Sequence, residues 1–99
     1  AINGLCKSCA KEVGTLGITV NALCPGAIET DVMMAQGPGA AEAMGLTYEG
    51  LLNVFAQESA VKRLNECEDV ALVAVLLASE AGAGITGSMI SIDGGTSPY

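Results

Sequence analysis

A short, mostly apolar run that ends at Pro-Gly constrains this chain most strongly. Residues 18–24 read Ile-Thr-Val-Asn-Ala-Leu-Cys, and Pro25 and Gly26 follow directly. Proline cannot donate a hydrogen bond to a neighbouring strand, and glycine adopts backbone angles that other residues avoid, so we expect the strand to end there. A strand this apolar is typical of a buried parallel sheet. The next residues then lie beyond the carboxyl end of a strand, where open parallel sheets bind ligands.

Two helices are predicted from the spacing of apolar residues. Over residues 1–16 the apolar side chains recur at gaps of three and four, with polar side chains between them. A second helix is expected over residues 65–79, with Asn65 as its cap and acidic side chains at its positive end. Residues 70–77 are apolar on every side of that helix, which predicts burial on more than one side.

The middle of the chain has a weaker pattern. Residues 31–46 mix methionines with Gly and Pro, so we expect them to be irregular. Thr47 is a suitable cap for a helix that continues to Ser59. A last strand is predicted over residues 88–92, and Asp-Gly-Gly follows it.

Strands that alternate with helices indicate the α/β class. We predict two strands and three or more helices, and 99 residues allow one domain at most. The chain is 51% hydrophobic but only 3% aromatic. Small aliphatic side chains suit helices that pack on a parallel sheet, and a small self-sufficient core normally needs larger anchors. We therefore expect part of this apolar surface to be covered by another segment of the subunit or by a second subunit.

The net charge of −7 bears on the partners of the chain. Such a chain repels phosphate backbones, which argues against nucleic-acid binding. No basic amphipathic stripe and no apolar run of membrane-spanning length is present, so no membrane partner is expected. The chain opens on Ala-Ile-Asn-Gly without the features of a secretory leader, and we expect a cytoplasmic protein.

Four cysteines raise the question of a metal or redox site. Cys6 and Cys9 form a C-x-x-C pair on the first predicted helix, whereas Cys24 and Cys67 stand alone. The chain has no histidine and no second C-x-x-C pair at zinc-ribbon spacing. We favour small buried hydrophobic residues in a reducing compartment and predict no metal site; a cysteine metal or redox site is the alternative.

The run from residue 18 to Thr30, with its Pro-Gly and a threonine four residues after the glycine, resembles the nicotinamide-binding segment of the short-chain dehydrogenase/reductase family. Other segments resemble further parts of that family in the same order and at similar spacing. They are residues 4–12, residues 62–64 with 68–71, residues 85–87 and residues 92–95.

The resemblance implies a particular part of the family's chain. The family's glycine-rich phosphate loop is missing, and neither Tyr48 nor Tyr99 has a lysine four residues on. We therefore expect this chain to be the carboxyl-terminal part of a Rossmann-like, doubly wound parallel sheet, beginning just after the catalytic Tyr-x-x-x-Lys. No catalytic residue is predicted within it, and the chain alone is expected to be inactive.

The resemblance also implies cofactor-binding residues. Pro25 and Gly26 would shape the turn, the backbone of Ile28 would meet the carboxamide of NAD or NADP, and the Thr30 hydroxyl would make a contact nearby. The alternative is an ordinary strand exit, in which Thr30 and Asp31 cap a short helix.

Residues 25–60 resemble the family's cofactor-binding segment and the lid over its substrate. The residues predicted to line the substrate are apolar and include most of the methionines. They are Met33, Met34, Met44, Leu46 and Phe55. The alternatives are core filling by each of these side chains and a surface connection that covers a core.

For the assembled protein, the resemblance implies an NAD(P)-dependent oxidoreductase that interconverts an alcohol and a carbonyl. Its partners would be the upstream half of the subunit, a small-molecule substrate and further copies in a homodimer or homotetramer. Leu5, Cys9 and Val13 are candidates for one subunit contact, and residues 66–92 for another. A non-catalytic fragment or interaction module is the alternative.

Overall fold

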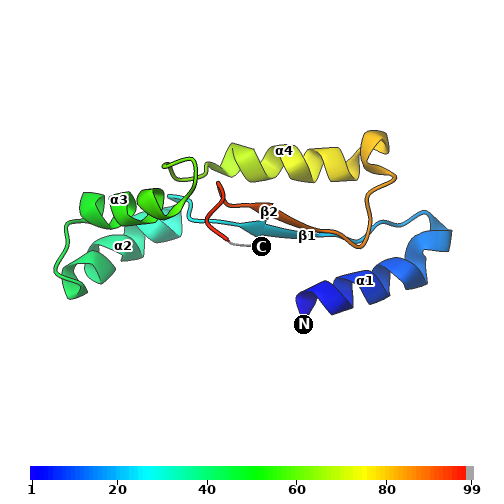
Figure 1. The fold of residues 1–99 in the computed structure, drawn as a ribbon, viewed down its shortest axis with the longest axis horizontal. Coiled ribbons are helices and arrows are strands. Elements are labelled where there is room, and N and C mark those ends of the chain that lie inside the picture. The colour runs from blue at the N-terminus through cyan, green and yellow to red at the C-terminus, as the bar shows by residue number, and fades with distance from the viewer. Residues whose placement is uncertain (98–99) are drawn as a thin grey trace. The chain divides into compact units, whose positions relative to one another are not determined.

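The computed structural model describes residues 1–97 and contains two strands, four α-helices and two short 3-10 helices (Figure 1). They divide into two units, one of residues 1–24 and 68–91 and one of residues 25–67 and 92 onward. In chain order the elements are α1 (Ile2–Val13), η1 (Gly14–Leu16), β1 (Ala22–Pro25), α2 (Asp31–Ala43), α3 (Tyr48–Glu58), α4 (Cys67–Ala78), η2 (Glu80–Gly82) and β2 (Met89–Ile92).

The predicted α/β class is confirmed by a parallel pair of strands between helices. β1 and β2 are hydrogen-bonded neighbours, and the Ala22 N–H donates to the Ser88 carbonyl at 2.9 Å. Figure 1 shows α4 on one side of this pair and α1 on the other, which is the layering of an α/β protein. β2 matches the strand predicted over residues 88–92, whereas β1 is shorter than the predicted 18–24.

β1 begins at Ala22 and not at residue 18, because side chains make part of the hydrogen bonding between residues 20–21 and 85–88. The Asn21 amide nitrogen donates to the Ile85 carbonyl at 2.9 Å, and the Asn21 amide oxygen accepts from the Ser88 N–H at 3.1 Å. One residue earlier, the Val20 N–H donates to the Thr86 hydroxyl at 3.0 Å. Asn21 therefore has a structural hydrogen-bonding role, and it holds the two strands together at their amino ends.

The first predicted helix is confirmed as α1 continued by η1. Cys6 and Ala10, one turn apart, are the buried residues of α1. The thiol of Cys6 donates to the Val20 carbonyl at 3.3 Å, and the Lys7 ammonium donates to the Gly87 carbonyl at 2.9 Å. These contacts attach α1 to the segments that lead into both strands.

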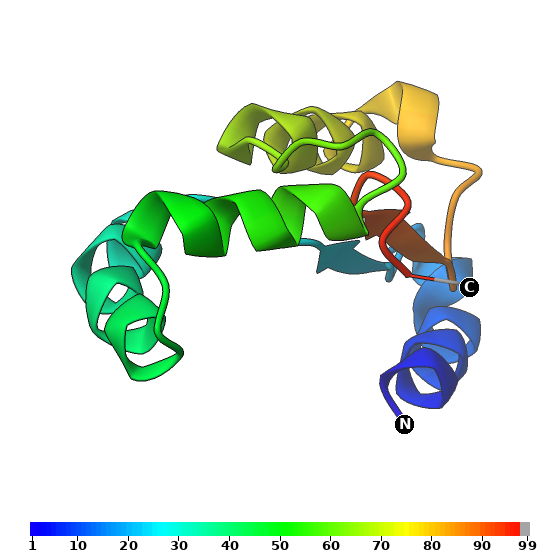
Figure 2. The same ribbon diagram turned by 60° about the vertical axis from the view of Figure 1, so that its left-hand side comes forward.

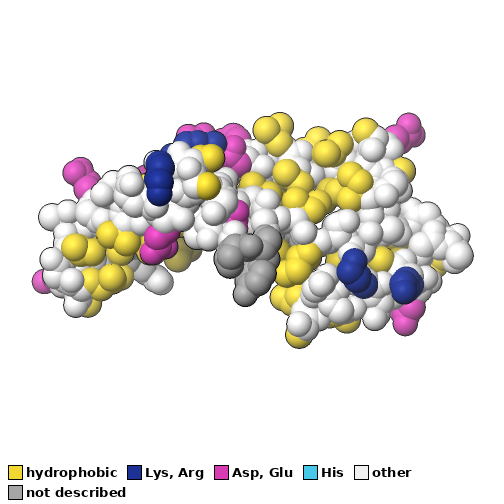
Figure 3. Space-filling view, in the orientation of Figure 1, with side chains coloured by type: hydrophobic (Ala, Val, Ile, Leu, Met, Phe, Trp, Pro, Cys, Tyr) yellow, Lys and Arg dark blue, Asp and Glu magenta, His cyan; other side chains and the backbone are white. Residues whose placement is uncertain are grey.

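α4 matches the position of the helix predicted over residues 65–79 but not its expected burial. The helix begins at Cys67, two residues beyond the predicted cap Asn65. None of its residues is buried, and Leu72 and Val75 are 71% and 68% exposed. Hydrophobic side chains are correspondingly visible over α4 in Figure 3. No helix within residues 1–97 is both long enough and apolar enough to cross a membrane.

The prediction that residues 31–46 are irregular is wrong, because α2 occupies most of this range. The Thr30 hydroxyl caps the helix by accepting from the Met33 N–H at 3.4 Å, and Asp31 adds negative charge to its first turn. The helix forms even though Pro38 lies inside it and removes one backbone donor.

α3 begins where the sequence predicts. The Thr47 hydroxyl accepts from the Gly50 N–H at 3.0 Å, so Thr47 is the cap of the helix. α2 and α3 lie side by side as a hairpin (Figure 2), and their buried apolar residues are Ala41 and Leu51. The buried apolar side chains of the helical hairpin are thus one alanine and one leucine.

We expect Asn21→Ala to destabilise the protein by about 1–3 kcal/mol, because the Ile85 carbonyl and the Ser88 N–H each lose a partner. The measurement is chemical denaturation of both proteins. Asn21→Asp, which keeps the acceptor for Ser88 but turns a second acceptor toward the Ile85 carbonyl, should also be destabilised. Equal stability of wild type and Asn21→Ala would contradict the bridging role.

Candidate functional site

The predicted cofactor-binding residues lie where β1 ends and the second unit begins. Pro25 is the last residue of β1, and the next N–H, that of Gly26, donates to the Ile92 carbonyl at 3.0 Å. This bond continues the ladder of the two strands past the proline, which has no N–H to offer. The chain therefore leaves the sheet at its carboxyl end, as predicted.

Gly26 packs directly against the turn that follows β2. A Cβ placed on Gly26 would lie 2.8 Å from the Asp93 Cα and 2.9 Å from the Asp93 Cβ. Backbone atoms cannot move away as a flexible side chain can, so this position accepts only glycine without distortion. The sequence predicts that Gly26 shapes the turn, and the structure shows the contact with Asp93 that requires a glycine at this position.

The turn that Gly26 contacts is itself held by hydrogen bonds. One carboxylate oxygen of Asp93 accepts from the Gly95 N–H at 3.0 Å, and the other accepts from the Ser97 N–H at 3.0 Å. The Val61 N–H donates to the Gly94 carbonyl at 3.1 Å. Sequence reasoning identified this Asp-Gly-Gly as a turn but not as a support for the strand exit, because the two are far apart in the chain.

The backbone N–H of Ile28 donates no hydrogen bond to any acceptor within residues 1–97. It forms an isolated parallel bridge with Asn65, whose N–H donates to the Ala27 carbonyl at 3.1 Å. The Ile28 carbonyl accepts from the Thr30 N–H at 2.9 Å and retains a second lone pair. A carboxamide needs one donor and one acceptor, and the Ile28 backbone can supply both.

The Thr30 hydroxyl is a helix cap, which was the alternative to a cofactor contact. It uses a lone pair to accept from the Met33 N–H. A hydroxyl has one proton and two lone pairs, so capping leaves the proton of Thr30 available to a ligand. The two roles are therefore compatible in this geometry.

A side-chain contact that the sequence analysis missed lies beside Ile28 and Thr30. The Tyr48 hydroxyl donates to a carboxylate oxygen of Glu29 at 2.7 Å. Loss of hydration and this hydrogen bond to the carboxylate raise the pKa of Tyr48 from 10.0 to about 12. The hydrogen bond thus stabilises the fold fully below pH 10, and its contribution is lost as the pH rises through about 12.

The predicted substrate-lining residues all lie on or between α2 and α3. Met33 and Phe55 are half-buried, whereas Met34 and Met44 are 50% and 61% exposed. Leu46, in the turn between the helices, is 37% exposed. Figure 3 shows hydrophobic side chains at the surface of this hairpin. They are therefore neither a closed core nor a formed pocket within the described part of the chain.

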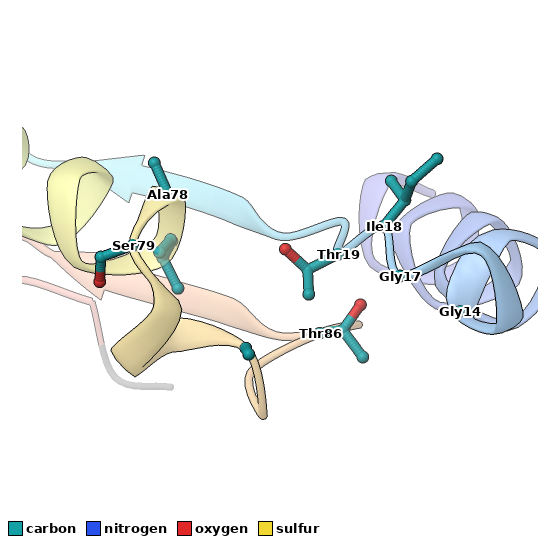
Figure 4. Close-up of a pocket in the computed structure, with 9 residues that line it drawn as sticks. Gly14, Gly17, Ile18, Thr19, Ala78, Ser79 and Thr86 are labelled. Carbon is teal, nitrogen blue, oxygen red and sulfur yellow. The ribbon is translucent and has the colours of Figure 1, made fainter.

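A separate pocket of about 360 Å³ lies in the first unit (Figure 4). It is lined by Thr19, Ser79 and Thr86, by glycines and alanines, and by the larger Ile18 and Leu77. None of the predicted cofactor or substrate residues lines it. Its walls are mainly glycine, alanine and hydroxyl side chains without an ionisable group, so it offers no acid–base chemistry.

All four cysteines are free thiols. Cys6 is buried and Cys67 is exposed, so the expectation of small buried residues fits Cys6 and not Cys67. Within residues 1–97 no three His, Cys, Asp or Glu side chains come together in a way that could hold a metal ion.

Comparison with known proteins identifies the family. The family profile described as enoyl-(acyl carrier protein) reductase matches residues 1–97. The chain is 40% identical over 95 residues to D-beta-hydroxybutyrate dehydrogenase of Rhizobium meliloti, an alignment that covers 95% of this chain and 37% of that enzyme.

Solved structures agree with this match. Sorbitol-6-phosphate 2-dehydrogenase from Erwinia amylovora superposes with a TM-score of 0.87 at 30% identity, covering 98% of this chain and 38% of that one. L-sorbose reductase from Gluconobacter frateurii, solved with NADPH and L-sorbose, gives 0.86 at 28% identity, with coverages of 98% and 37%.

The chain therefore belongs to the short-chain dehydrogenase/reductase family. It spans little more than a third of the length of the relatives it matches.

We expect Gly26→Ala to destabilise the protein by about 1–3 kcal/mol, because the new methyl group would overlap the Asp93 backbone. Gly39→Ala is the matched control, since a Cβ at this exposed position of α2 meets nothing within 4 Å. That control should be stabilised by about 0.5–1 kcal/mol, because alanine favours a helix over glycine. Thermal unfolding of the two variants measures both effects, and a harmless Gly26→Ala would refute the close packing.

Proposed function

We propose that this chain is the nicotinamide-binding part of an NAD(P)-dependent oxidoreductase that interconverts an alcohol and a carbonyl. The observation that carries the proposal is the N–H of Ile28, which has no hydrogen bond within residues 1–97 and lies just beyond the carboxyl end of β1. Family membership supports it, because known members include dehydrogenases and reductases of small hydroxy and carbonyl compounds.

The residues present fit the nicotinamide end of such a cofactor. When bound, the cofactor supplies the hydride chemistry. The Ile28 N–H and carbonyl orient the carboxamide, the Thr30 hydroxyl donates a hydrogen bond beside it, and Gly26 holds this loop against the turn at Asp93. The chain's own contribution is thus binding and orientation.

Proton transfer to the substrate requires groups that this chain does not supply. No tyrosine of the sequence is followed by a lysine four residues later. We infer that the chain corresponds to the carboxyl-terminal part of the family's subunit, and that an upstream Tyr-x-x-x-Lys segment provides the acid–base pair. A non-catalytic interaction module is the second candidate, because a chain without the Tyr-x-x-x-Lys motif lacks the acid–base pair.

The α2–α3 hairpin is proposed as the lid over a small-molecule substrate. Its flexible methionine side chains stand at the surface, where they can adapt to an irregular apolar ligand. The proposed cofactor is NAD or NADP. L-sorbose reductase was solved with NADPH, and YwfH, an NADPH-dependent reductase involved in bacilysin biosynthesis, is 31% identical to this chain.

We also propose a homodimer or homotetramer in the cytoplasm. The apolar stripe of α1 and the surface of α4 are open: Leu5 is 65% exposed, Leu72 is 71% exposed and Val75 is 68% exposed. Covering such surface removes apolar area from water and favours association. The upstream segment and a second subunit are the proposed partners for these faces.

The proposal is tested by comparing two proteins. We expect the 99-residue chain alone to show no turnover with NAD or NADP, and a longer protein that carries the preceding Tyr-x-x-x-Lys segment to reduce carbonyls or oxidise alcohols. The measurement is nicotinamide absorbance with a panel of small hydroxy acids and polyols, on proteins of verified mass. Turnover by the 99-residue chain alone would refute the proposal that its acid–base pair lies upstream. Failure of the longer protein to bind NAD or NADP would refute the proposal that it is an oxidoreductase.

Three substitutions at Thr30 separate its cap from its cofactor contact. Thr30→Ala should lose about 0.5–2 kcal/mol of stability and bind cofactor about three- to tenfold more weakly. Thr30→Asp keeps a capping oxygen but no proton, so we expect retained stability and weakened binding. Thr30→Ser keeps both the capping oxygen and the hydroxyl proton, so it is the control. Unchanged cofactor affinity in the Ala and Asp variants would show that Thr30 is a cap alone.

A further inference from the structure

α2 is a helix that its own sequence supports poorly. Its middle reads Gly37-Pro38-Gly39. Each glycine loses more backbone freedom than alanine does on entering a helix. Pro38 has no N–H to donate to the Met34 carbonyl, and the proline ring lies too close to that carbonyl. The helix also buries only Gly37 and Ala41. Contacts from outside the helix must therefore hold this turn in place.

Tyr48 makes such a contact at the weakest turn of α2. A Cβ placed on Gly37 would lie 3.0 Å from the Tyr48 Cδ1 and would also overlap the Cε1. The Met33 sulfur lies 3.5 Å from the same point. The phenol ring thus occupies the space that a side chain at Gly37 would need, next to the Met33 thioether. The absence of a side chain at position 37 is what lets Tyr48 sit there.

The far end of the same side chain reaches the loop after β1. The Tyr48 hydroxyl donates to Glu29 at 2.7 Å, across 19 positions of the chain. Glu29 stands between Ile28, whose backbone is proposed to orient the carboxamide, and Thr30, which caps α2. One side chain at the start of α3 therefore contacts both α2 and the proposed cofactor loop.

We propose that Tyr48 is a positioning residue, which latches the α2–α3 hairpin to Glu29 and so holds Ile28 and Thr30 in the geometry that binds nicotinamide. The positioning part rests on the proposed function, whereas the latch itself does not. A phenol donating to a carboxylate is a charge-assisted hydrogen bond, and it is stronger than one between neutral groups. Because Glu29 is exposed, water can compete for this bond, and the latch is reversible.

The latch is tested first by amide hydrogen exchange, which needs no cofactor. Tyr48→Phe keeps the ring on Gly37 but removes the hydroxyl, and Glu29→Ala removes the acceptor. Each should speed exchange of the α2 amides about three- to tenfold, and the double variant should add nothing further, because both remove one bond. Glu42→Ala, an exposed carboxylate of α2, is the matched control and should leave exchange unchanged. Unchanged exchange in both single variants overturns the latch.

The positioning role is tested by cofactor binding in the longer protein that carries the upstream segment. The reduced cofactor is titrated by its fluorescence into wild type, Tyr48→Phe and Glu29→Ala. We expect the Kd to rise about three- to tenfold in both variants, with kcat at saturating cofactor changed by less than about twofold. Glu29→Gln, whose amide oxygen still accepts from the phenol, should recover part of the affinity.

The outcomes separate this inference from the proposed function. Wild-type protein that binds neither NADH nor NADPH refutes the proposed function and the positioning role, and exchange then still decides the latch. Wild-type binding with unchanged affinity in Tyr48→Phe and Glu29→Ala overturns the positioning role alone. If Tyr48→Phe fails to fold, Glu29→Ala provides both measurements without altering the packing on Gly37.

Discussion

The close approach of Gly26 to Asp93 is the contact on which the candidate site depends. The bond from the Gly26 N–H to the Ile92 carbonyl continues the parallel ladder past Pro25, and the missing side chain lets the strand exit rest on the Asp93 turn. Asp93 in turn secures that turn with both carboxylate oxygens. The backbone of Ile28 is therefore presented from a loop that is fixed on both sides, and a preorganised loop spends less free energy on ordering when a ligand binds.

The rest of the described chain is held by polar contacts more than by an apolar core. Its buried apolar residues are Cys6, Ala10, Ala41 and Leu51, all of which are small except the leucine. Asn21 ties the amino ends of the strands together, and Tyr48 ties the helical hairpin to Glu29 in the loop that follows β1. A structure with so little buried apolar area gains little from the hydrophobic effect, so covering the exposed apolar faces of α1 and α4 would stabilise it further.

Several elements were predictable because their signals are local. Thr47 caps α3 with its own side chain, and the apolar spacing of residues 1–16 reports a helix whatever its surroundings. The residues of the helical hairpin were harder to predict. The stretch 31–46 contains Gly37-Pro38-Gly39, which locally disfavours a helix, and the contact that compensates comes from Tyr48 on another element. Propensity was overridden there by tertiary packing, a term that no window of sequence contains.

The sequence by itself determined the α/β class, the place where the first strand stops, the family and the residues that follow its Pro-Gly. Those features depend on proline chemistry, on apolar periodicity and on a motif order that can be read along the chain. Only the tertiary structure decided that Gly26 meets Asp93, that Asn21 replaces part of the strand ladder and that Tyr48 bonds Glu29. Each of these joins residues distant in sequence, and such pairs become neighbours only when the strands have aligned and the helices have packed.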